Sequence, residues 1–190
     1  MKYSLVLFFS FLSLCGFAQQ KQFTLDERGK YVYYEVVDVK INKDSLVQRA
    51  ENFTKINKKS FLKSILTDSS IISEGRMIID KTILVASHPS GEVNYTFNFE
   101  ARDGKYRYWI TDLTYIPYNR DRYGNYVATT NIATPLEKTP GKLSAGAWKD
   151  ITETVYAKAV KLGENFKKTL ATAQVVAQPR KAESISTKKW

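Results

Sequence analysis

The sequence predicts an α+β fold in which an antiparallel sheet of four to five strands has two helices packed on one face. Three observations support this fold. Residues 31–39 are dominated by β-branched and aromatic side chains, which favour a strand. Residues 93–101 alternate between apolar and polar, and residues 147–173 repeat apolar side chains at helical spacing. Because each element has one apolar side, helices gathered on one sheet face bury these sides together and leave the other face open to solvent.

The remaining elements follow from local signals. Asn42 or Asp44 can cap a helix. Its apolar face is formed by side chains three and four positions apart, namely Leu46, Ala50, Phe53 and Ile56. Residues 61–66 are expected to add a short helical turn, and residues 71–84 a second strand. The His-Pro-Ser-Gly sequence of residues 88–91 is typical of a turn.

The Asp103-Gly104 pair predicts which side chains of a hairpin share a face. Asp-Gly is a preferred two-residue hairpin loop, and a loop here sets Phe99 opposite Tyr108 on an apolar face. On the other face the expected cross-strand pairs are Glu100–Arg107, Asn98–Trp109, Thr96–Thr111 and Asn94–Leu113. Opposite charges and paired threonines suit a solvated face. Trp109 and Leu113 are therefore apolar exceptions on a polar surface.

Residues 117–146 are rich in Asn, Thr, Pro and Gly and predict a long irregular connection, with a short extended piece at 123–129. Tyrosines and arginines are dense at its start. Such side chains are favoured at interfaces, so we expect a ligand surface on the open face with this loop as its rim. Its candidate residues are Arg107, Trp109, Thr111, Leu113, Tyr118, Arg120, Arg122 and Tyr123. The alternative is that the loop buries Trp109 against its own tyrosines.

The first 18 residues have the features of a signal peptide. Lys2 precedes an apolar run from Leu5 to Phe17, and Gly16 and Ala18 supply the small residues of a cleavage site before Gln19. The run is too short to span a bilayer, which takes about 20 residues. We therefore expect an exported protein, periplasmic or in the outer envelope, with no membrane span in the processed chain. A buried N-terminal helix is the alternative.

Cys15 is a second candidate for processing. Leu12-Ser13-Leu14-Cys15 resembles a lipid-attachment sequence, although Leu14 stands where a small residue is expected. Cleavage after Ala18 instead removes this single cysteine. The processed chain would then have no disulfide, thiol nucleophile or cysteine-based metal site.

The domain organisation expected is a signal peptide at 1–18, one α+β domain at 19–173 and a disordered basic tail at 174–190. The whole chain carries a net charge of +10. An exported protein rarely meets nucleic acid, so this excess favours an anionic envelope component, a glycan or a protein as partner. The excess charge could also serve solubility alone.

No catalytic motif stands out in the sequence. His88 is the single histidine and is expected to be solvated in its turn. There is no nucleophile elbow, glycine-rich dinucleotide motif or P-loop, and nothing in the spacing of Asp112 and Asp121 requires acid–base chemistry. We expect no enzyme activity, no metal and no cofactor. Asp44-Ser45-Leu46 matches a short bacterial O-glycosylation pattern, in competition with a capping role for Asp44.

Two segments carry a resemblance to a known family. Residues 29–37, Gly-Lys-Tyr-Val-Tyr-Tyr-Glu-Val-Val, and the hairpin of residues 103–112 resemble an exported bacterial domain family of unknown function with a TATA-binding-protein-like fold. The resemblance covers about residues 22–173 and implies the fold, with no activity and no DNA binding. Trp109 departs from it, since a small polar residue is expected there.

These observations favour a non-catalytic envelope binding domain whose open sheet face contacts an unknown ligand. One alternative is a structural protein that its basic C-terminal residues, Lys167 to Lys189, tether electrostatically to acidic envelope components. A hydrolase that uses unrecognised carboxylates is a further alternative, and it requires a pocket with shifted pKa values.

Overall fold

The computed structural model describes residues 22–83, 86–138 and 144–172. Its elements in chain order are β1 (Thr24–Leu25), β2 (Tyr31–Asp38), α2 (Lys43–Ile56), β3 (Phe61–Leu66), β4 (Ser70–Ile83), β5 (Ala86–Arg102), β6 (Lys105–Arg120), β7 (Tyr126–Ala128), β8 (Thr134–Pro135) and α3 (Ala145–Ala171). The eight strands pair antiparallel in the order β1-β2-β6-β5-β4-β3, and β7 and β8 also pair with β6. The α+β class is confirmed, with more strands than expected.

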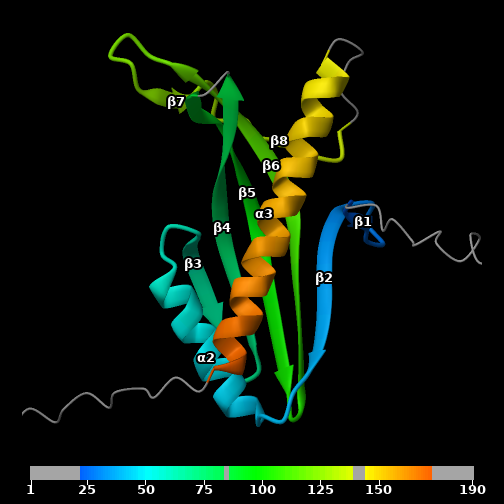
Figure 1. The fold of residues 1–190 in the computed structure, drawn as a ribbon. Coiled ribbons are helices and arrows are strands. Elements are labelled where there is room, and N and C mark those ends of the chain that lie inside the picture. The colour runs from blue at the N-terminus through cyan, green and yellow to red at the C-terminus, as the bar shows by residue number, and fades with distance from the viewer. Residues whose placement is uncertain (1–21, 84–85, 139–143, 173–190) are drawn as a thin grey trace, which may run out of the picture.

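Both helices lie on the same face of the sheet (Figure 1). Asn42 caps α2, because its Oδ1 accepts a hydrogen bond of 2.8 Å from the backbone N of Ser45. The helix buries Leu46, Ala50 and Phe53 as predicted. Ile56, expected on the same apolar face, is instead 71% exposed at the last residue of the helix.

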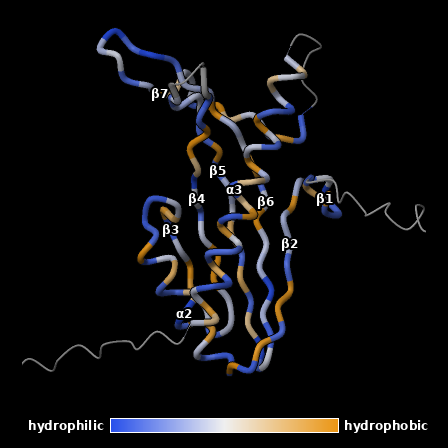
Figure 2. The backbone as a smooth tube through the Cα atoms, viewed as in Figure 1, coloured by the Kyte–Doolittle hydropathy of each residue, from blue (hydrophilic) through white to orange (hydrophobic). Residues whose placement is uncertain are grey.

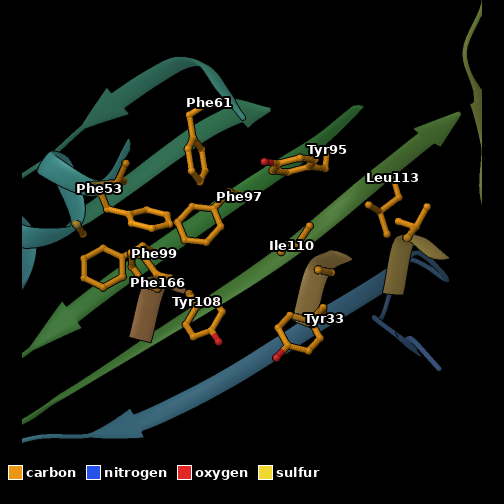
Figure 3. Packing of buried hydrophobic residues seen from close by; sticks show 14 of the residues in the cluster. Tyr33, Phe53, Phe61, Tyr95, Phe97, Phe99, Tyr108, Ile110, Leu113 and Phe166 are labelled. Atoms are coloured by element: carbon orange, nitrogen blue, oxygen red, sulfur yellow. The ribbon is translucent and has the colours of Figure 1, made fainter. Parts of the chain in front are cut away.

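A cluster of aromatic rings holds α3 against the sheet (Figure 3). Phe166 of α3 is fully buried, and its ring centroid lies 5.1 Å from that of Phe97 and 5.2 Å from those of Phe53 and Tyr108. Edge-to-face pairs of this kind add to the free energy gained by burial. Gly163, one turn earlier, lets the helix approach, because a Cβ there would lie 2.5 Å from the Tyr108 hydroxyl oxygen.

The hairpin between β5 and β6 follows the predicted register over its first half. Gly104 has a φ of +78°, as a tight Asp-Gly loop requires. The apolar pair Phe99–Tyr108 and the polar pair Glu100–Arg107 both lie opposite one another. Figure 2 shows how hydrophilic and hydrophobic residues follow one another along these strands.

A β-bulge changes the register of β6 at Asp112. Thr96 lies opposite Thr111, whereas Asn94 lies opposite Thr114, so β6 has one extra residue between these pairs. Asp112 takes a positive φ of +53° at this point. The predicted pair Asn94–Leu113 is therefore wrong. The extra residue turns Leu113 to the helix-covered face, where it is fully buried.

Three loop or turn predictions are wrong because the strands are longer than their sequences indicate. Residues 61–66 form edge strand β3, which pairs with β4, rather than a helical turn. Residues 88–91 lie inside β5, and Pro89 lies at a register irregularity opposite Asp80, where its missing N–H is tolerated. The expected 117–146 connection begins later than predicted, because β6 continues to Arg120. The extended piece expected at 123–129 is confirmed by β7, and β7 and β8 both pair with β6.

A charged pair joins β2 to α3. Lys167 Nζ lies 2.6 Å from Glu35 Oε2. The other carboxylate oxygen, Glu35 Oε1, accepts a hydrogen bond from the Tyr33 hydroxyl. Partial burial acts to raise the pKa of Glu35, but the hydrogen bonds from Lys167 and Tyr33 outweigh it and hold that pKa below its ordinary value. The folded state therefore favours the carboxylate.

The predicted signal peptide, Cys15 and the basic tail at 174–190 lie outside the described residues. Among the residues that are described, neither helix is both apolar and long enough to cross a bilayer.

Because the bulge buries Leu113, whereas Ile72 is exposed, truncating these two apolar side chains should change the free energy of unfolding by different amounts. Leu113→Ala should lower the free energy of unfolding by about 2–5 kcal/mol, because it opens a cavity in the core. Ile72→Ala, on the open face, should change it by less than about 1 kcal/mol. Urea denaturation measures both. A cost for Leu113→Ala no larger than that for Ile72→Ala would contradict the bulge.

The Glu35–Lys167 pair predicts a dependence of stability on pH. Because the pKa of Glu35 is lower in the folded than in the unfolded chain, where it is about 4.3, the pair stabilises the fold above that pH, and this contribution is lost as the pH falls through the folded value. Lys167→Met should cost about 1 kcal/mol at pH 7 and reduce the loss of stability on acidification. Lys161→Met, on the same helix, should change neither quantity. Equal acid sensitivity of the Lys167 variant and the unchanged chain would contradict the assignment.

Candidate functional site

The strand register gathers apolar side chains in one row across the face of the sheet opposite the helices, here called the outer face. Ile72 of β4 lies opposite Asn98 of β5, Asn98 opposite Trp109 of β6, and Trp109 opposite Tyr34 of β2. Tyr34 is 48% exposed and Trp109 is half-buried. Their ring centroids lie 6.5 Å apart at an interplanar angle of 43°. Adjacent strands therefore present an aromatic pair to solvent.

Arg107 is fixed beside this pair. Its Nε donates a hydrogen bond of 2.8 Å to Glu100 Oε2, and its Nη2 lies 2.6 Å from the same oxygen. The guanidinium carbon lies 5.3 Å from the centroid of the Trp109 ring, in a cation–π arrangement. The hydrogen bond with Glu100 raises the pKa of Arg107 above its ordinary value. The charge of Arg107 is thus compensated within the site.

A turn before β2 forms the second wall. The Asp26 carboxylate accepts hydrogen bonds from the backbone N–H groups of Lys30 and Arg28 at 2.8 and 2.9 Å, and from the Arg28 side chain. These bonds, the one from Lys30 first, lower the pKa of Asp26. Arg28 also lies 3.8 Å from Asp112 and donates to Thr111 Oγ1 at 3.5 Å. The turn therefore lies over Thr111.

A hollow of about 440 Å³ separates this turn from the aromatic pair. Residues of the turn and of β1 line one side, and Tyr34, Arg107 and Trp109 line the other. A second hollow, of about 260 Å³, adjoins it toward the β5–β6 loop and shares Tyr34 and Arg107. Together the two hollows form a track along β2 on the outer face.

The structure brings only part of the predicted site together. Arg107 and Trp109 do lie on the outer face. Thr111 points the same way, but the Arg28 turn covers it and leaves it 3% exposed. Leu113 is in the core because of the bulge.

The predicted rim residues lie elsewhere. Tyr118 is nine residues along β6 from Trp109, roughly 30 Å at strand spacing, and donates to Glu92 Oε2 at 2.7 Å. Arg120 donates to the Gly124 carbonyl at 3.3 Å, and Arg122 lies over the ring of Tyr123, all within the β6–β7 hairpin at the far end of the sheet (Figure 1). The prediction that this segment rims or covers Trp109 is wrong, and the turn before β2 occupies that place.

His88 is not a solvated loop residue. It lies on β5, is half-buried, and its ring packs edge-on against Tyr126 of β7 with centroids 5.0 Å apart. Over the described part of the chain, no three His, Cys, Asp or Glu side chains are grouped closely enough to hold a metal ion.

Sequence reasoning missed Tyr34 and Val36, which also line the track. Side chains alternate between the two faces of β2, so Tyr34 and Val36 lie on the face that Tyr33 and Glu35 do not share. Apolar residues on both faces of this strand hide that alternation in the sequence. Their proximity to Trp109 depends on the pairing of β2 with β6, which connects distant parts of the sequence.

The segment that contains Tyr34, Arg107 and Trp109 matches a known protein family. Residues 33–116 match a family described as a domain of unknown function, DUF4468, with a TBP-like fold. The matched region runs from β2 into β6 and includes Tyr34, Arg107 and Trp109, whereas the Arg28 turn and α3 lie outside it. The predicted family resemblance is confirmed.

Two solved structures share this fold. One is a TBP-like protein from Parabacteroides distasonis, with 13% identity, a TM-score of 0.55, and coverage of 76% of this chain and 95% of its own. The other is a DUF4468 family protein from Bacteroides ovatus, with 13% identity, a TM-score of 0.52, and coverage of 83% and 94% respectively. At this identity the likeness shows the fold alone. No curated protein matches the chain.

Proposed function

We propose that the protein is an exported, non-catalytic binding domain whose outer face holds an uncharged, hydroxyl-rich ligand such as a glycan strand of the bacterial envelope. The observation that carries the proposal is the pair of partly exposed rings, Tyr34 and Trp109, fixed on adjacent strands beside a hollow. Aromatic side chains on rigid strands bury a large area at low entropic cost. The predicted signal peptide supports export.

The charges around the rings favour an uncharged ligand. Arg107 is paired with Glu100, and Arg28 is paired with Asp26 and Asp112. A phosphate or carboxylate would have to displace these carboxylates before it could bind either guanidinium. A sugar ring needs no such exchange. Its C–H face can stack on an aromatic ring, and its hydroxyls can reach polar side chains such as Asn98 in the same row.

Two carboxylates of the track, Asp26 and Glu100, support a non-catalytic role. Asp26 accepts several hydrogen bonds, and its pKa is lowered, whereas a general acid needs a raised one. Glu100 is held by Arg107. Neither group is poised to transfer a proton to a bound sugar.

The proposal predicts salt-resistant binding that depends on Trp109. The processed chain from Gln19 should co-sediment with purified peptidoglycan or with uncharged chitin across a series of salt concentrations. Trp109→Ala should weaken binding by about tenfold or more while the chain stays folded. The matched control is Tyr123→Ala, which removes an aromatic residue that is 74% exposed at the far end of the sheet and should have no effect.

Two outcomes would contradict the proposal. One is binding that Trp109→Ala leaves unchanged, or no binding to either polymer. The other is binding that falls steeply with salt and is lost on truncation after Ala173, which would indicate electrostatic tethering through the C-terminal residues.

A further inference from the structure

Strand β3 ends the sheet and leaves one backbone edge free. It pairs with β4 on one side, and no other described strand pairs with it. Three of its six residues, Leu62, Ile65 and Leu66, are large apolar side chains that are about half exposed. An apolar edge of this kind is a template for pairing with another chain. Native proteins pair such edges, cover them, or protect them with short strands, charged side chains and bulges.

A groove borders the free edge. Its volume is about 340 Å³, and it lies between β3 and the C-terminal part of α2. Its lining residues are Glu51, Thr54, Lys55 and Lys58 from the α2 side, Phe61, Leu62, Ser64 and Leu66 from β3, and Ile71 from β4. A helix beside an open strand edge is the geometry in which an extended peptide can add as a further strand. Main-chain hydrogen bonds would hold such a peptide, and the groove would take its alternate side chains.

The charges at this edge identify the kind of peptide. Lys58, Lys59 and Lys63 are exposed, and within the described ranges none of them has an ion-pair partner within 4 Å. Lys55 is already paired with Glu51 at 2.6 Å. The edge therefore combines apolar side chains with three exposed lysines, of which Lys63 lies opposite Glu74 of β4 in the register. An extended segment that alternates apolar and acidic side chains complements both features.

We propose that the β3 edge binds an extended acidic segment of a partner protein by strand addition. The same charges disfavour two other occupants. A second copy would set the lysines of one β3 edge against those of the other, and lysines on edge strands are a known device against self-pairing. The chain's own C-terminal segment carries Arg180, Lys181, Lys188 and Lys189 against Glu183 alone, so its charge is repelled as well. This proposal is independent of the ligand of the outer face.

Selection from a random twelve-residue peptide library tests the proposal on the processed chain. Enriched peptides should alternate apolar and acidic residues, and their binding should slow hydrogen exchange at the backbone amides of residues 62–66. The double variant Lys58→Glu/Lys63→Glu should weaken binding of the selected peptides by roughly tenfold. Lys161→Glu on α3 is the matched control, because Lys161 is equally exposed but distant from this edge, and it should leave binding unchanged.

Each contrary outcome overturns the proposal. The selection could enrich no peptide, or peptides that bind the double variant and the unchanged chain equally well. Hydrogen exchange could slow on the outer face instead of at β3. Sedimentation could reveal a concentration-dependent dimer that Leu62→Asp abolishes, which would identify a second copy as the occupant. Circular dichroism confirms that each variant is folded before its binding is compared.

Discussion

The packing of Phe166 into the aromatic cluster is the contact on which the rest of the structure depends. This one side chain of α3 contacts rings of α2, β5 and β6 and so joins the helix layer to the sheet. Gly163 allows the close approach that the contact needs. Because both helices are thereby held on one face, no helix of the described residues covers the other face. The outer surface proposed to bind a ligand is a direct consequence of where the core forms.

The bulge at Asp112 then limits what that outer face contains. Before it, odd-numbered residues of β6 such as Trp109 face outward, and after it they face the core, as Leu113 does. At Asp112, which has a positive φ, the set of β6 residues that face outward changes from odd-numbered to even-numbered. Arg28 pairs with Asp112 and lies over Thr111, so the same irregularity anchors the turn that walls the hollow. Fold and site share this constraint.

Local signals in the sequence were sufficient wherever neighbouring residues decide the structure. The Asp103-Gly104 loop, the alternation before it and the apolar face of the last helix gave the correct elements. Leu113 was misplaced because a bulge changes register without a distinct sequence signal. Aspartate is enriched at positive φ, but a residue with positive φ is uncommon, so one aspartate in a strand does not predict it. Strand β3 was missed because an edge strand forms by pairing with β4, and the pattern of two apolar, two polar and two apolar residues at 61–66 fits a helical turn equally well. Tyr34 was missed because its position beside Trp109 depends on pairing across the sequence.

Thiol labelling in native envelopes tests most directly whether the outer face is a binding surface. Cleavage at the predicted site removes the single native cysteine, so a cysteine introduced by Val36→Cys, at an exposed position on the track, reports on that face alone. Tyr123→Cys, at the far end of the sheet, serves as the reference. If the outer face binds a ligand in the envelope, Val36→Cys should react rapidly in the purified protein and slowly in envelopes, while the reference reacts equally in both. Equal labelling of Val36→Cys in the two settings would show that the face is unoccupied and would contradict a binding role.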